Sequence, residues 1–228
     1  MYVSPSRPYI GLLTVFQLPF YFQAVRGAST VESGVMYLPT AGALALGALA
    51  SGPLTRYIGF YNVPLTAGSC IMVVGMGLMT TFAPHTDPAK WISFQIVYGI
   101  GIGLAFQPPF IAVQTVLEDS LVPKALVLLS YIQQSGGIVM LSAAQNVFLS
   151  RLSRNLAQQV PGLDDRAVLS SGALNLVQNV PASLRNQVLI AYNEALMQVL
   201  YMALGLTCVA AVAALGLEWK SVKKERKT

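Results

Sequence analysis

The side chains best suited to ligand chemistry in this sequence are amides and aromatics that recur every three or four positions inside apolar stretches. Within 126–148 such a series is formed by Tyr131, Gln134, Ile138, Ser142 and Gln145. Within 91–113 a second series is formed by Gln95, Tyr98, Ile102 and Phe106. Residues with this spacing share one face of a helix, so each series is a polar and aromatic stripe.

These stripes admit two interpretations. Amide side chains in hydrocarbon need hydrogen-bond partners or water, so they face a bundle interior or a cavity. Taken together, and with Gln17 in 9–25, they predict the lining of a path for an amphipathic ligand. The alternative is that they only join helices to one another by hydrogen bonds.

Acid–base, metal and redox chemistry has little support in the sequence. His85 lies in a short polar turn, and Cys70 and Cys208 lie in apolar stretches without a CxxC motif or a Cys/His cluster. Asp164 and Asp165 are adjacent, but no base, nucleophile or metal ligand accompanies them. We therefore predict no catalytic site, metal or cofactor, and an intramembrane enzyme is the weakest interpretation.

Proton coupling is also not visible within the apolar segments. Proton-coupled transporters usually place a titratable group in the membrane, whereas these segments contain no Asp, Glu, Lys or Arg. Glu194, Glu118 and Asp119 are the candidates that could reach a cavity. We expect each of them at an interface or in a loop.

The elements that carry the stripes follow from composition. The 228-residue chain is 54% hydrophobic and 10% charged, with a mean hydropathy of +0.59, whereas soluble domains are about 25% charged. About 20 apolar residues cross a bilayer as a helix, so we predict an all-α membrane protein. Its six helices are predicted at 9–25, 35–54, 63–82, 91–113, 126–148 and 195–217. This composition argues against a soluble enzyme, a nucleic-acid-binding domain or a disordered chain.

The orientation follows from Lys and Arg in the short loops, which concentrate on the cytoplasmic side. With both termini cytoplasmic, the inner side carries Arg7, Arg56, Lys124, Lys220, Lys223, Lys224, Arg226 and Lys227. The short outer loops then carry only Arg26 and Lys90. The predicted organisation is five helices in 1–149, an extracytoplasmic connection with short helices in 150–194, the last helix in 195–217 and a basic cytoplasmic tail in 218–228. One short helix is expected after Pro161, and another from near Ser183 that can run straight into the last helix.

The first predicted helix is unusual. Arg7 followed by an apolar run is similar to a signal peptide, but Gln17, Pro19 and Gln23 interrupt the run and no convincing cleavage site follows. We interpret 9–25 as the later part of a membrane helix whose start has been cut or replaced.

Small residues predict close packing between helices. Spacing of four residues relates Ala43, Gly47 and Ser51 in one segment, and Gly99 and Gly103 in another. Such ladders allow backbones in lipid to approach closely. Pro108 and Pro109 should kink or end the helix that contains the second ladder.

Several short motifs in a fixed order resemble the C-terminal half of the fungal fourteen-helix drug:proton antiporters of the major facilitator superfamily, the group of the aflatoxin and trichothecene efflux pumps. The motifs are LPFYFQAVRG at 18–27, SG at 33–34, LP at 38–39, GPLTRYIGFY at 52–61, YGIGIG at 98–103 with Gln107 and Pro109, QN at 145–146, AYNEAL at 191–196 and LEWKSVK at 217–223.

The resemblance implies one six-helix half of this fold, in which the first, second, fourth and fifth helices line a cavity. The low amide content of 63–82 and 195–217 agrees with this arrangement. It also implies efflux of amphipathic organic compounds or toxins by alternating access, with proton coupling in the full-length parent. The loop motif Gly52, Arg56 and Gly59 departs from the usual pattern, because Arg56 and Tyr57 stand where an Asp-Arg pair is typical.

The expected partners are a small amphipathic substrate, the lipid bilayer, and either a missing N-terminal half or a second copy of the chain. The expected location is the plasma or vacuolar membrane. A non-transporting remnant or partner subunit from a truncated gene is the alternative function.

Overall fold

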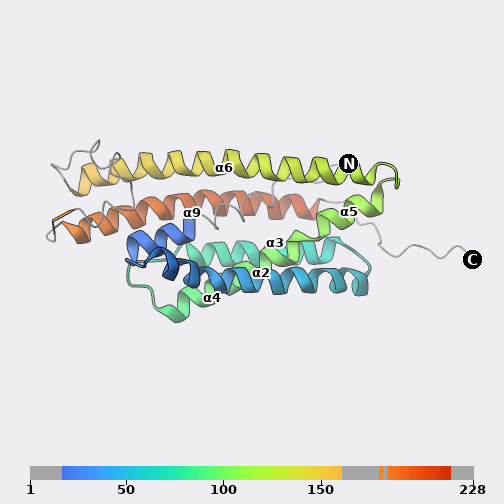
Figure 1. The fold of residues 1–228 in the computed structure, drawn as a ribbon, viewed down its shortest axis with the longest axis horizontal. Coiled ribbons are helices and arrows are strands. Elements are labelled where there is room, and N and C mark those ends of the chain that lie inside the picture. Colours follow the sequence, from blue (N-terminus) through green and yellow to red (C-terminus); the bar gives the residue numbers. More distant parts are fainter. Residues whose placement is uncertain (1–16, 161–179, 182–183, 217–228) are drawn as a thin grey trace, which may run out of the picture.

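The computed structural model describes residues 17–160, 180–181 and 184–216, and within them every element is a helix (Figure 1). Five spans are long and apolar enough to cross a membrane. They are α2 (Thr30–Ile58), α3 (Asn62–Met79), α4 (Pro88–Phe106) continued by α5 (Pro108–Val116), α6 (Val122–Gln159) and α9 (Arg185–Leu215).

Only the end of the first predicted crossing lies among the described residues. Residues 17–20 are α-helical and the π-helix η1 (Tyr21–Val25) follows, whereas 1–16 lie outside the described residues. The six predicted crossings therefore correspond to five spans and the last turns of another helix. The basic tail 218–228, the pair Asp164 and Asp165, and the short helix expected in that part of the connection also lie outside the described residues.

Two helices extend well beyond the apolar segments from which they were predicted. α6 continues to Gln159, and α9 begins at Arg185, so the short helix expected from near Ser183 and the last predicted crossing form one continuous helix. The reason is that the helical pattern persists after the uncharged stretch ends: Leu152 and Leu156 are fully buried while Arg151 and Arg154 point outward. Charge ends the apolar run but not the helix, so much of the predicted connection 150–194 is helical.

The helices lie side by side in a clear order. α6 packs on α9, α9 on α3, α3 on α4, and α4 on α2 (Figure 1). α6 is the long helix along one side of the molecule, and among the described elements it contacts only α9 and α5 substantially. One side of α6 is therefore left without a helical neighbour in the described part of the chain.

Glycines bring α2, α3 and α4 into backbone contact. A methyl group added at Gly99 of α4 would lie 2.6 Å from the carbonyl oxygen of Thr40 in α2, and one added at Gly75 of α3 would lie 2.6 Å from the Tyr98 backbone nitrogen of α4. The ladder residues Ala43, Gly47, Ser51, Gly99 and Gly103 all lie in the α2–α4 contact. Ser51 adds a hydrogen bond, because its hydroxyl donates to the Leu104 carbonyl oxygen at 2.8 Å.

Local residue types explain where α2 begins and ends and where α4 gives way to α5. α4 ends at Phe106 and α5 begins at Pro108, so the proline pair interrupts this span as predicted, because proline lacks a backbone donor and crowds the preceding turn. α2 begins with a capping box between Ser29 and Glu32. It ends at Ile58 and is capped by Gly59, whose φ of 84° is a left-handed conformation that glycine adopts without strain.

Candidate functional site

α6 has two contrasting faces. Gly137, Ala144 and Phe148 are buried toward the rest of the bundle. The predicted stripe lies on the side of the helix next to this buried face: Tyr131 is 68% exposed and Ile138 63% exposed, and Gln134, Ser142 and Gln145 are also exposed. The structure therefore presents this stripe on an open helix surface.

A hollow of about 480 Å³ lies against this face, lined by Phe20, Leu141, Ser142, Gln145 and Asn146. Asn146 donates its amide hydrogen to the Ser142 carbonyl oxygen at 2.9 Å, and the Ser142 hydroxyl donates to the Ile138 carbonyl oxygen at 3.0 Å. Both side chains are thereby held along the helix surface. The hollow combines an aromatic ring with amide and hydroxyl groups and contains no charged side chain among its described lining residues.

Phe20 is positioned by contacts of the residues that follow it. The Tyr21 hydroxyl donates to the Ala83 carbonyl oxygen at 2.7 Å, and Arg26 donates to the Thr86 carbonyl oxygen. The ring of Phe22 packs edge-on against Trp91 with 5.0 Å between centroids. The turn before α2 is thus tied to the loop between α3 and α4.

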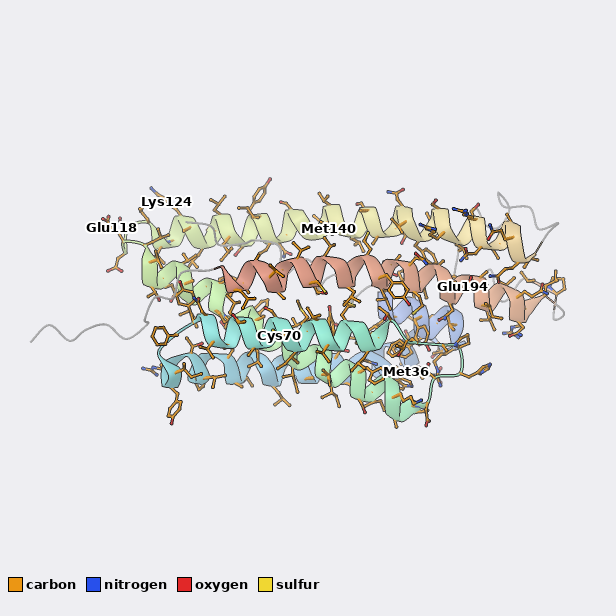
Figure 2. All side chains as sticks on the ribbon, turned by 180° about the vertical axis from the view of Figure 1, so that it is seen from behind. Met36, Cys70, Glu118, Lys124, Met140 and Glu194 are labelled. Carbon is orange, nitrogen blue, oxygen red and sulfur yellow. The ribbon has the colours of Figure 1, made fainter. Side chains whose placement is uncertain are left out.

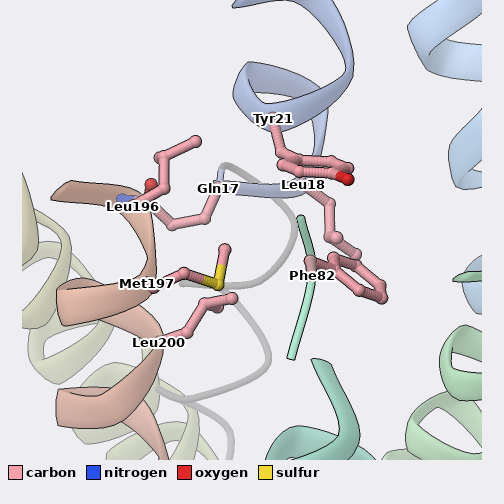
Figure 3. A pocket seen from close by; sticks show the side chains of 7 residues that line it. All are labelled: Gln17, Leu18, Tyr21, Phe82, Leu196, Met197 and Leu200. Carbon is pink, nitrogen blue, oxygen red and sulfur yellow. The ribbon is translucent and has the colours of Figure 1, made fainter. Parts of the chain in front are cut away.

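Gln17 occupies a different place from the α6 stripe. It is buried and, with Leu18, Tyr21 and Phe82, faces Leu196, Met197 and Leu200 of α9 across a gap of about 10 Å³ (Figure 3). A gap of this size is close to the minimum for a single water molecule. The structure therefore places Gln17 in a helix contact.

Gln95 and Tyr98 are fully buried between helices. The Thr40 hydroxyl of α2 donates to the Gln95 side-chain oxygen at 2.7 Å, and the Tyr98 backbone packs on Gly75. Small residues on α2 and α3 let α4 approach so closely that both side chains are enclosed. These two residues correspond to the alternative interpretation of the stripes, in which polar groups join helices. Phe106 is 45% exposed and lies beside Phe110 at the α4–α5 break, so the two stripes do not meet in one described cavity.

The chain is similar to known proteins over most of its length. No family model matches the sequence. The efflux pump aflT of Aspergillus parasiticus is 39% identical over 213 residues, which is 93% of this chain and 41% of that protein. The efflux pump roqT of Penicillium rubens and the MFS-type efflux pump MFS1 of Trichophyton rubrum are each 36% identical over 94% of this chain and 40% of their own length. Over nearly its whole length, the chain is therefore similar to fungal MFS-type efflux pumps. It spans about two fifths of the length of these relatives.

The loop motif Gly52, Arg56 and Gly59 lies at the end of α2. Arg56 is exposed, and with Gly52, Pro53, Thr55 and Ile111 it lines a hollow of about 580 Å³. Gly59 ends the helix as described above. The motif therefore supplies a cation and a helix stop at one end of the bundle.

The carboxylates that were candidates for proton coupling all lie at exposed positions. Glu118 and Asp119 lie between α5 and α6, and Glu194 lies on α9 (Figure 2). The Gln159 side-chain amide donates to Glu194 at 2.8 Å, which joins the outer parts of α6 and α9. The described residues contain no group of three His, Cys, Asp or Glu that could bind a metal ion.

Sequence reasoning missed three residues that shape these sites. Asn146 lies four positions after Ser142, so the same spacing rule could have added it to the hollow. Phe20 lines the hollow although it belongs to another segment, and no local pattern indicates this. Thr40 partners Gln95 across two helices, and a hydroxyl in an apolar segment gives no signal of its own.

Proposed function

We propose that this chain is one six-helix half of a membrane efflux pump that exports amphipathic organic compounds by alternating access. The relatives are named as efflux pumps or transporters, and one of them as an aspyridones efflux protein. The exposed face of α6 then forms part of the transport path, opposite the other half of the pump.

One observation carries this proposal: the amide-bearing face of α6 has no helical neighbour in the described part of the chain. Gln134, Ser142 and Gln145 would otherwise face hydrocarbon, where polar side chains are costly and are found turned inward or toward water. A path or a second half supplies partners for the two amides, whereas the Ser142 hydroxyl already donates within α6. Gln95 and Tyr98 support the path indirectly, because they hold α4 against α2 and α3.

The proposed orientation places both termini in the cytoplasm of a plasma or vacuolar membrane. The end of α2 that carries Arg56 and the start of α6 that carries Lys124 lie at the same end of the bundle, where α9 also ends (Figures 1 and 2). Arg26 and Lys90 lie in or beside the connections at the opposite end. This distribution agrees with the rule that short cytoplasmic loops are rich in Lys and Arg.

The proposed partner is an N-terminal half of the same family, and energy is supplied by a proton gradient across the complete pump. A second copy of this chain is the other partner that could complete the path. A non-transporting remnant is not favoured, because the relatives that match nearly all of the chain are named as pumps and transporters.

The test uses a paired transporter, defined as this chain joined to the N-terminal half of the Aspergillus parasiticus relative. It is expressed in yeast lacking its own drug exporters, and resistance to a panel of uncharged toxins, cycloheximide among them, is measured. We expect resistance that disappears when a protonophore collapses the proton gradient. A paired transporter that folds and reaches the membrane but confers no resistance contradicts the proposal.

A matched pair of variants locates the path. Gln134→Leu on α6 should reduce export about tenfold, because it removes a polar contact in the path. Gln198→Leu is the control, since Gln198 is also an exposed amide but lies on α9. Equal effects of both variants would contradict the assignment of the path to α6. Cross-linking of the isolated chain tests the alternative of two identical halves.

A further inference from the structure

The break between α4 and α5 deprives one backbone carbonyl of its helical partner. In an uninterrupted helix the Leu104 carbonyl oxygen would accept from the backbone nitrogen of residue 108, but Pro108 has no N–H to donate. The Ser51 hydroxyl of α2 donates to this oxygen instead, at 2.8 Å. Ser51 is fully buried, so the bond lies inside the α2–α4 contact. A side chain of one helix thus supplies the hydrogen bond that a proline removes from the next.

Beyond the break the chain is held less tightly. α4 contacts α2 and α3 extensively, whereas α5 makes only a few contacts with each of its neighbours. Gln107 at the junction is exposed, and its carbonyl oxygen accepts from the backbone nitrogens of Phe110 and Ile111 at 3.0 and 3.2 Å. The first turn of α5 is therefore closed on itself, which makes α5 a separate rigid segment on the far side of Gln107.

Open space lies between this segment and the end of α2. The hollow of about 580 Å³ has four lining residues on α2 and one, Ile111, on α5. A methyl group added at Gly52, the residue after Ser51, would meet no atom within 4 Å. The hollow therefore begins directly beside the Ser51 hydrogen bond, and α5 forms its other wall.

The bond and a closed hollow exclude each other. The freed Leu104 carbonyl faces α2, because Ser51 reaches it, and a proline ring bends a helix away from the carbonyl that it crowds. α5 accordingly leads away from α2 toward the start of α6 (Figure 1). Movement of α5 back toward α2 would close the opening that the Ser51 hydroxyl occupies, and would narrow the hollow at the same time.

We propose that Ser51 is a positioning residue for a hinge at Gln107: its hydrogen bond to Leu104 holds α5 away from α2, and its release lets α5 close the hollow. The inference rests on the proposed function, because closure at one end of the bundle is a step of alternating access. Hinges of this kind place the backbone change in a few residues at the ends of elements. A bond made only in the open arrangement favours that arrangement, so its loss shifts the population toward the closed one.

The test measures the distance between α2 and α5 in the paired transporter, in which every cysteine has been replaced, in lipid nanodiscs. Spin labels are attached at Tyr57→Cys and Gln114→Cys, two exposed positions outside the lining of the hollow. Pulsed electron paramagnetic resonance should give a longer and a shorter distance, one for each arrangement. Ser51→Ala should raise the ratio of short to long distances about fivefold, the size of one net hydrogen bond. A ratio that Ser51→Ala leaves unchanged overturns the inference.

Pro108→Ala separates the hinge from simple packing. The alanine supplies the N–H that proline lacks, so the Leu104 carbonyl regains a helical partner and the shorter distance should predominate. In this background Ser51→Ala should change the ratio by less than about twofold, because the carbonyl no longer depends on the hydroxyl. An equal effect of Ser51→Ala in both backgrounds would mean that Ser51 acts by packing, which overturns the inference.

Controls keep the result independent of folding and of the proposed function. Ser69 is also fully buried, but its hydroxyl donates at 2.6 Å to Leu65 of its own helix, so Ser69→Ala should leave the ratio unchanged, and an equal shift contradicts the hinge. If Ser51→Ala lowers the unfolding temperature, adding Pro108→Ala should restore it, and failure to do so also counts against the inference. If the unchanged paired transporter confers toxin resistance but shows a single distance, the hinge fails and the efflux function stands.

Discussion

The α2–α4 contact and the outer face of α6 present the same kinds of side chain in opposite settings. Gln95 and Tyr98 are fully buried, whereas Gln134 is exposed and Tyr131 is 68% exposed. The difference lies in the neighbours: glycines on three helices let α4 sit in backbone contact with α2 and α3, while the α6 stripe has no described helix opposite it. A polar stripe in an apolar helix therefore acquires its role from the residues across from it.

The largest expected difference between the two regions is in the cost of removing a tyrosine. Tyr98→Ala should lower the free energy of unfolding by about 3–5 kcal/mol, because it empties a fully buried site. Tyr131→Ala removes a largely exposed ring and should change it by less than about 0.5 kcal/mol. The measurement is thermal or denaturant unfolding of both variants in detergent. Similar losses for both would mean that the α6 face is packed in the folded protein.

A second comparison tests whether glycine contacts enclose the α2–α4 region. Gly47→Ala should destabilise the chain by about 1–3 kcal/mol, because the new methyl would lie 2.8 Å from the Ile100 carbonyl oxygen. Gly42 is on the same helix and has no atom within 4 Å of an added methyl, so Gly42→Ala should be neutral or stabilising by about 0.5–1 kcal/mol. Unfolding temperatures of the two variants decide the matter, and a stable Gly47→Ala protein would contradict the close packing.

The sequence predicted the fold more completely than the site. Uncharged stretches of helical length located every span, and Pro108 marked the break between α4 and α5, because burial in lipid and the missing proline donor are local properties. The end of α6 was wrong, since Leu152 and Leu156 continue a buried face among arginines. The enclosure of Gln95 was not predictable from its own spacing, because it depends on Thr40 and on glycines far away in the chain.

A third prediction concerns the hydrogen bond between Thr40 and Gln95. Thr40→Val should cost about 2 kcal/mol, because it leaves the buried Gln95 amide without the hydroxyl that donates to its oxygen. Gln95→Met should cost less, about 1 kcal/mol, because it also removes an amide nitrogen that has no hydrogen-bond partner. In the double variant the loss should be smaller than the sum, since each change removes the same bond. Additive losses would show that the two side chains do not interact in the folded protein.

Single cysteine substitutions should change stability least. Their reactivity is the most direct test of the comparison between the two stripes. Cys70 and Cys208 are exposed on other helices, so both are first replaced by serine in the paired transporter. Gln134→Cys should then react with a membrane-impermeant maleimide at least about tenfold faster than Gln95→Cys, because the thiolate that reacts forms only where water reaches the sulfur. A lipid-soluble maleimide supplies the control. If Gln134→Cys reacts only with the lipid-soluble reagent, the α6 face points to acyl chains rather than to a water-filled path, and the distinction drawn between the two stripes would be one of packing alone.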